Sequence, residues 1–95
     1  MNQELRSRIE RAAKLDAKFR RAAINAGGPY TTRPLIEFGL SIPRTLTVAN
    51  AAGRARRFLS AAECEEWQQI MLKLIPLLPS DEISATYGLA EMAAF

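Results

Sequence analysis

The stretch TLTVANAAGRARRFLSAAE, residues 45–63, decides where the second half of the chain is helical, because it ends in a helix start signal. Ser60 and Glu63 have the spacing of a capping box. In that motif the serine hydroxyl accepts a hydrogen bond from the glutamate N–H, and the glutamate carboxylate accepts one from the serine N–H. Leu59 and Cys64 occupy the positions of a hydrophobic staple. The signal predicts a break in helix at Ser60 and a new helix directly after it.

The same stretch also resembles the helix-turn-helix of DNA-binding proteins. Ala49, Gly53 and Leu59 have its spacing, and Gly53 would make the turn. Arg56, Arg57 and Ser60 would face the major groove on the second helix. The capped start and a recognition helix running through it exclude each other, and one continuous helix is a third alternative. We favour the capping box because a regular apolar stripe begins immediately behind it.

Two long amphipathic helices are predicted on either side of this stretch. Apolar residues recur at helical spacing over residues 3–26 and again over residues 61–75. Pro76 and Pro79 end the second of these helices, and a further helix is predicted over residues 81–94. The apolar positions are Leu5, Ile9, Ala12, Leu15, Phe19, Ala22, Ala23 and Ala26 in the first helix, and Cys64, Trp67, Ile70, Met71, Leu74 and Ile75 in the second.

A connector punctuated by proline separates the two long helices. Gly27 ends the first helix, because glycine tolerates the left-handed cap. Pro34 begins a brief helix at 34–40, and Pro43 begins another that ends between residues 52 and 58. The sequence therefore predicts an all-α fold: a small single-domain bundle of four to five helices over residues 1–95, with two long amphipathic helices and short proline-punctuated ones.

The net charge of +3 conceals a strong asymmetry between the two halves of the chain. Residues 1–57, the basic half, contain twelve Lys or Arg and four Asp or Glu. Residues 58–95, the acidic and apolar half, contain one Lys and six Asp or Glu. Such a division indicates either an anionic partner for the basic half or mutual neutralisation of the halves between subunits.

The composition argues against catalysis. The chain has no histidine, which removes the commonest general base, and its single cysteine lies on an apolar stripe. No cofactor motif and no metal-ligand spacing is present, so we expect a non-enzymatic protein without cofactor or metal. One cysteine, a charged opening segment and apolar runs too short to span a bilayer predict a cytoplasmic protein without a membrane partner.

Two hypotheses for function follow from the charge distribution. In the first, the chain is a small regulatory protein whose basic half docks on nucleic acid or a nucleoprotein complex. In the second, it is a helical adaptor or inhibitor, of the type found on mobile elements, that binds an acidic protein. The expected anion-binding residues are Arg6, Arg11, Lys14, Lys18, Arg20, Arg21, Arg54, Arg56 and Arg57.

Self-association is predicted from the apolar segment at residues 67–78. One helix face buries only part of its apolar side chains, and a large exposed apolar patch marks an interface. A homodimer or higher oligomer is therefore expected; the alternative is that the helix over residues 81–94 folds back and covers the surplus. The predicted interface residues are Trp67, Ile70, Met71, Leu72, Leu74, Leu77 and Leu78.

Overall fold

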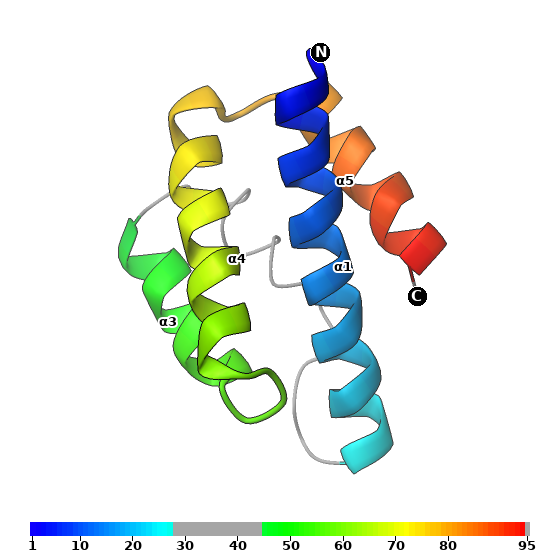
Figure 1. Ribbon diagram of the computed structural model, residues 1–95, viewed down its shortest axis with the longest axis vertical. Coiled ribbons are helices and arrows are strands. Elements are labelled where there is room, and N and C mark those ends of the chain that lie inside the picture. The colour runs from blue at the N-terminus through cyan, green and yellow to red at the C-terminus, as the bar shows by residue number, and fades with distance from the viewer. Residues whose placement is uncertain (28–44, 95) are drawn as a thin grey trace.

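The computed structural model describes residues 1–27 and 45–94, and its regular elements in these ranges are all helical (Figure 1). This confirms the all-α prediction, with two long helices close to their expected bounds. The predicted brief helix at 34–40 lies outside the described residues. The elements are α1 (Gln3–Ala26), α3 (Thr45–Ala55), α4 (Ala61–Leu74), the 3-10 turn η1 (Ile75–Leu77) and α5 (Asp81–Ala94).

Both ends of α1 are capped as local chemistry requires. The Asn2 side chain accepts a hydrogen bond of 2.8 Å from the Leu5 N–H and so satisfies one of the free donors of the first turn. At the other end Gly27 has φ 63°, the left-handed conformation that glycine adopts without a Cβ penalty. The predicted end of the first helix at Gly27 is confirmed.

The start of α4 is the predicted capping box. Ser60 is extended, with φ −65° and ψ 160°, and its hydroxyl accepts a hydrogen bond of 3.1 Å from the Glu63 N–H. The Glu63 carboxylate accepts one of 3.0 Å from the Ser60 N–H. The helix-turn-helix alternative is wrong, because Gly53 lies inside α3 instead of forming the turn, and the chain leaves the helix before Ser60.

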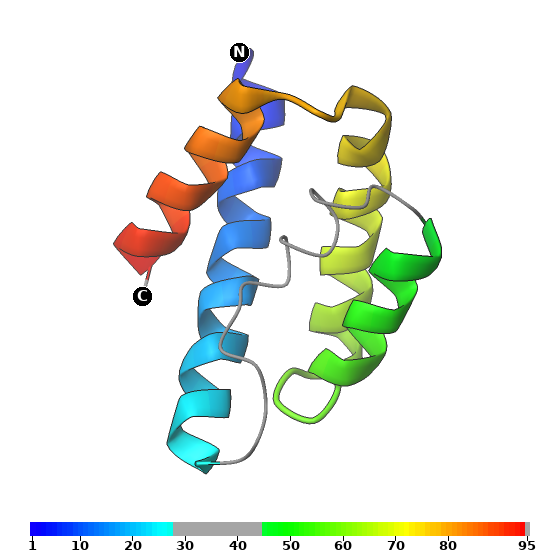
Figure 2. The same ribbon diagram turned by 180° about the vertical axis from the view of Figure 1, so that it is seen from behind.

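The four α-helices of the described residues pack in a fixed order, with α1 between two neighbours. α4 runs antiparallel to α1 on one side, and α5 runs alongside α1 on the other in roughly the same direction (Figures 1 and 2). α3 packs against α4 on the side away from α5. α1 therefore has one edge that meets α4 and another that meets α5. The partners of its basic side chains depend on which of these edges they occupy.

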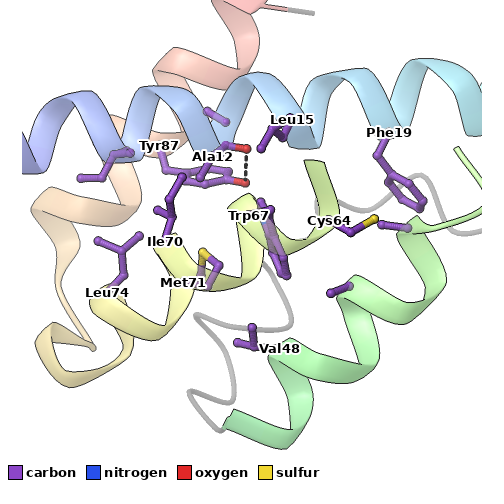
Figure 3. Close-up of a cluster of buried hydrophobic side chains, with 14 of the residues drawn as sticks. Ala12, Leu15, Phe19, Val48, Cys64, Trp67, Ile70, Met71, Leu74 and Tyr87 are labelled. Carbon is purple, nitrogen blue, oxygen red and sulfur yellow. Dashed lines mark hydrogen bonds between the residues drawn. The ribbon is translucent and has the colours of Figure 1, made fainter. Parts of the chain in front are cut away.

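The hydrophobic core lies where these helices meet (Figure 3). Trp67 and Met71 of α4 are fully buried, and Val48 of α3 and Tyr87 of α5 join the same cluster. The apolar stripe of α4 thus contacts both α1 and α3. Because α3 covers part of this stripe, α4 has fewer apolar side chains to spare than its sequence indicates.

The predicted interface at residues 67–78 needs correction. Four of its seven residues belong to the core of the single chain and cannot lie between two folded copies; they are Trp67, Ile70, Met71 and Leu74. Leu72 and Leu78 are half-buried, whereas Leu77 is 49% exposed. The alternative, in which the helix over residues 81–94 folds back and covers the surplus, does not hold for Leu77, because α5 packs along α1. Self-association itself stays a prediction.

Candidate binding surface on α1 and α5

Three of the basic side chains of α1 are paired with carboxylates of the acidic half. Arg11 binds both carboxylate oxygens of Glu66 in α4, one through its Nε and the other through its Nη2, the latter over 3.3 Å. On the same edge of α1, the Lys18 ammonium lies 2.7 Å from a Glu63 oxygen. On the opposite edge Arg20 binds the buried Glu91 of α5. At these three pairs the two halves of the chain neutralise each other within one molecule.

The ion pair between Lys18 and Glu63 changes the pKa of the Glu63 carboxyl group. The Lys18 ammonium, followed by the Ser60 N–H, lowers the pKa of Glu63 from its usual value near 4.5 to about 2. The carboxylate of Glu66 in turn raises the pKa of Arg11. These cations are held by internal anions, so an external polyanion would have to compete for them.

Arg6 and Lys14 differ from these paired residues. Neither lies within ion-pairing distance of a carboxylate in the described part of the chain, and both are exposed. They line an open groove of about 460 Å³ between α1 and α5, with Glu10 between them. The α5 side of the groove is formed by Thr86, Leu89, Ala90, Ala93 and Ala94. One wall of the groove is therefore charged and the other almost entirely apolar.

The outward face of α5 carries the two most exposed large apolar side chains of the described residues. Leu89 is 69% exposed and Met92 is 77% exposed. The other exposed positions of α5 after Glu82 are uncharged; they are Ser84, Ala85, Gly88 and Ala93. The one acidic side chain in this part of α5, Glu91, is turned inward and buried against Arg20. The result is an uncharged, partly apolar helix face beside the groove.

A buried polar contact fixes α5 on α1 beneath this surface. The Tyr87 hydroxyl lies 2.9 Å from an Asp16 carboxylate oxygen. It also lies 3.3 Å from the Ala12 carbonyl oxygen, and this second contact is drawn in Figure 3. Burial, with the nearby Asp16 charge, raises the pKa of Tyr87 well above 10. Arg21 adds a hydrogen bond of 3.2 Å to the Ala94 carbonyl. Asp16, an acidic residue inside an apolar stripe, is thus explained by a partner on α5.

The remaining predicted basic residues lie elsewhere. Arg54, Arg56 and Arg57 are exposed at the end of α3 and in the turn after it. That turn is anchored to the second half of α1 by an edge-on contact between Phe19 and Phe58, whose ring centres are 5.6 Å apart. The three arginines are therefore far along α1 from Arg6, and the nine predicted residues do not form one basic surface.

Arg56 lines a second hollow, between α3 and α4, of about 520 Å³. Its neighbours there include Glu65, Gln68 and Gln69, so the lining is of mixed polarity. Cys64 also borders it, but the residue is buried and burial raises the pKa of its thiol. The thiol accordingly stays protonated at neutral pH and acts as a core side chain.

Three residues of this surface were not predicted from the sequence, namely Glu10, Leu89 and Met92. A signal for two of them was present: Leu89 and Met92 fall off the helical stripe of α5 that contains Ile83 and Tyr87. The role of Glu10 had no signal in the sequence, because only the position of α5 creates a groove along that side of α1.

Several other kinds of site receive no support from the described residues. Within residues 1–27 and 45–94 no three His, Cys, Asp or Glu side chains lie close enough together to hold a metal ion. In the same ranges, none of the helices combines the length and the apolar character that crossing a membrane requires. No family model, curated protein or solved structure matches this chain.

Proposed function

We propose that this chain is a small non-enzymatic regulatory protein, an adaptor or inhibitor, that binds an acidic protein through the groove between α1 and α5. One observation carries the proposal: the exposed apolar side chains of Leu89 and Met92 lie on the helix that walls a groove containing Arg6 and Lys14. Apolar contacts give a protein interface its affinity, and flanking cations select partners of opposite charge.

Binding to nucleic acid is supported less well. A phosphate backbone is bound by many cations at once. Three of the six basic residues predicted on α1 already bind carboxylates, namely Arg11, Lys18 and Arg20. Glu10 places a negative charge among the lining residues of the groove, where it would repel a polyanion. An acidic protein can place a cation or a neutral group opposite Glu10, whereas a phosphate backbone cannot.

The test is affinity capture of the full chain from the cells that produce it, with each partner identified by mass spectrometry. Leu89→Glu is the informative variant, and Leu77→Glu is its matched control because Leu77 is also an exposed leucine but lies in η1 and does not line the groove. We expect a partner with net negative charge that survives nuclease treatment, is retained by Leu77→Glu and is lost with Leu89→Glu.

Two results would contradict the proposal. Loss of every partner on nuclease treatment would favour the nucleic-acid hypothesis. Equal capture by Leu89→Glu and by the unsubstituted chain would show that the α5 face is not the binding surface. Circular dichroism of both variants controls for folding, since each substitution changes a side chain that is already exposed.

A further inference from the structure

The charged wall of the groove has a regular pattern. Arg6, Glu10 and Lys14 follow each other at intervals of four residues and all three line the groove. With a rise of 1.5 Å per residue, neighbouring charges are about 6 Å apart along α1 and the two cations about 12 Å apart. A ligand lying along the groove therefore meets the sequence positive, negative, positive.

Most of the apolar wall has no polar backbone group to offer a ligand. Leu89 and Ala90 lie within α5, and the lining residues of α1 lie within α1, so their N–H and C=O groups belong to helical hydrogen bonds. Ala93 and Ala94 belong to the last turn of α5, whose C=O groups have no partner within the helix, and the Ala94 carbonyl accepts a hydrogen bond from Arg21. An extended peptide in the groove would therefore leave most of its own N–H and C=O groups without partners at this wall. A helix satisfies its own backbone and would meet the wall with side chains alone.

Small side chains in the wall suit such a ligand. Ala90, Ala93 and Ala94 allow a second helix to approach closely, and Leu89 supplies an apolar contact beside them. The eight-residue interval from Arg6 to Lys14 matches the interval from Thr86 to Ala94 on α5. The groove is therefore long enough for about two turns of a helix on both walls.

From this pattern, and resting on the function proposed above, we infer that the segment of the partner bound in the groove is an amphipathic α-helix with the complementary charge order. It carries two acidic residues about two turns apart, which reach Arg6 and Lys14, and a basic residue between them, which reaches Glu10. Its apolar stripe packs on Leu89. Glu10 then acts as a specificity determinant, because it rejects helices that are acidic throughout.

The test is a selection from a displayed library of helical peptides with a fixed leucine stripe. Three flanking positions, spaced four residues apart, are each randomised to Glu, Lys or Gln. The bait is the full chain, and clones that also bind the Leu89→Glu variant are discarded. We expect enrichment of the order Glu, Lys, Glu. With the Glu10→Lys variant as bait, we expect the middle position to change to Glu while the outer positions stay Glu.

A chosen Glu, Lys, Glu peptide then gives the magnitude. Exchange of its middle Lys for Glu should weaken binding to the unsubstituted chain about tenfold, or about 1.4 kcal/mol, since a partly exposed ion pair is replaced by a repulsion between like charges. The same exchange should strengthen binding to Glu10→Lys. Titration calorimetry measures both, and proline placed at the centre of the peptide should abolish binding if the ligand is helical.

The outcomes separate the two proposals. The same charge order selected by the unsubstituted chain and by Glu10→Lys, or a selection without Leu89-dependent clones, overturns the helix inference. If the natural partner is still lost with Leu89→Glu in the capture experiment, the proposed function stands without the helix inference. If Leu89→Glu leaves natural capture unchanged, the proposed function fails, whatever the library shows.

Discussion

Removing the Tyr87 hydroxyl should weaken the attachment of α5 to α1 measurably. Tyr87→Phe keeps the ring in the core and deletes only the donor that lies 2.9 Å from the Asp16 carboxylate. Both residues are almost fully buried, so water cannot replace the lost bond without rearrangement. A hydrogen bond to a charged group contributes about 1.5–3 kcal/mol, and we expect the free energy of unfolding to fall by that amount.

Urea denaturation followed by circular dichroism measures this loss, and thermal melts should show a fall in Tm of about 6–24 °C for a chain of this size. The matched control is Thr86→Val, which deletes a hydroxyl from the neighbouring residue of α5. That hydroxyl bonds only to the Glu82 carbonyl of its own helix on the exposed side, and its removal should cost less than about 0.5 kcal/mol.

The pH dependence supplies an independent signature. Since the pKa of Tyr87 is raised by burial, the folded chain keeps the phenol protonated above pH 10, where the unfolded chain loses that proton. The advantage of Tyr87 over Phe is therefore full below pH 10 and shrinks as the pH rises above it. A Tyr87→Phe chain as stable as the unsubstituted one, or a cost no larger than that of Thr86→Val, would refute the role given to this contact.

Three further predictions concern the capping box, its ion pair and self-association. Ser60→Ala should reduce the free energy of unfolding by about 1 kcal/mol in urea titrations, because the Glu63 N–H loses its acceptor, and an unchanged midpoint would contradict this. Because the pKa of Glu63 is lowered to about 2, its pairing with Lys18 stabilises the fold above pH 4.5, and this contribution is lost as the pH falls toward 2. In acid titrations the Glu63→Gln variant should therefore lose less stability over that interval than the unsubstituted chain. Leu77→Glu should leave the sedimentation mass unchanged, because most of the apolar side chains predicted as an interface are internal, and a lower mass would restore that interface.

Local signals in the sequence predicted the helix ends well. Ser60 and Glu63 are three residues apart, and Gly27 acts on the turn directly before it, so the interactions that fix these ends involve only neighbouring residues. The helix-turn-helix resemblance failed because it depends on small residues at a loose spacing, which an alanine-rich chain satisfies without forming the motif. A motif with two reciprocal hydrogen bonds was the better guide.

Contacts between distant residues were not predictable in the same way. Arg11 and Glu66 are separated by 55 positions, and their pairing depends on the rotation of α1 and α4 about their axes. The sequence showed that the two halves had opposite charge, but not whether they would meet within one chain. Likewise the apolar surplus at residues 67–78 was overestimated, because α3 covers part of α4 from the side opposite α1.

The ion pairs of α1 matter more for what the surface presents than for stability. Exposed pairs such as Arg11 with Glu66 contribute about 0–1 kcal/mol each, a small part of the stability of a folded domain. Their larger effect is on charge: they neutralise the edge of α1 that faces α4 and leave Arg6 and Lys14 as cations at the edge that faces α5. In the proposed function, the binding of an anionic partner by α1 is thereby confined to one groove. In the helix inference, Glu10 imposes a further requirement within that groove, because the charge order of α1 then distinguishes a matching protein helix from a uniform polyanion.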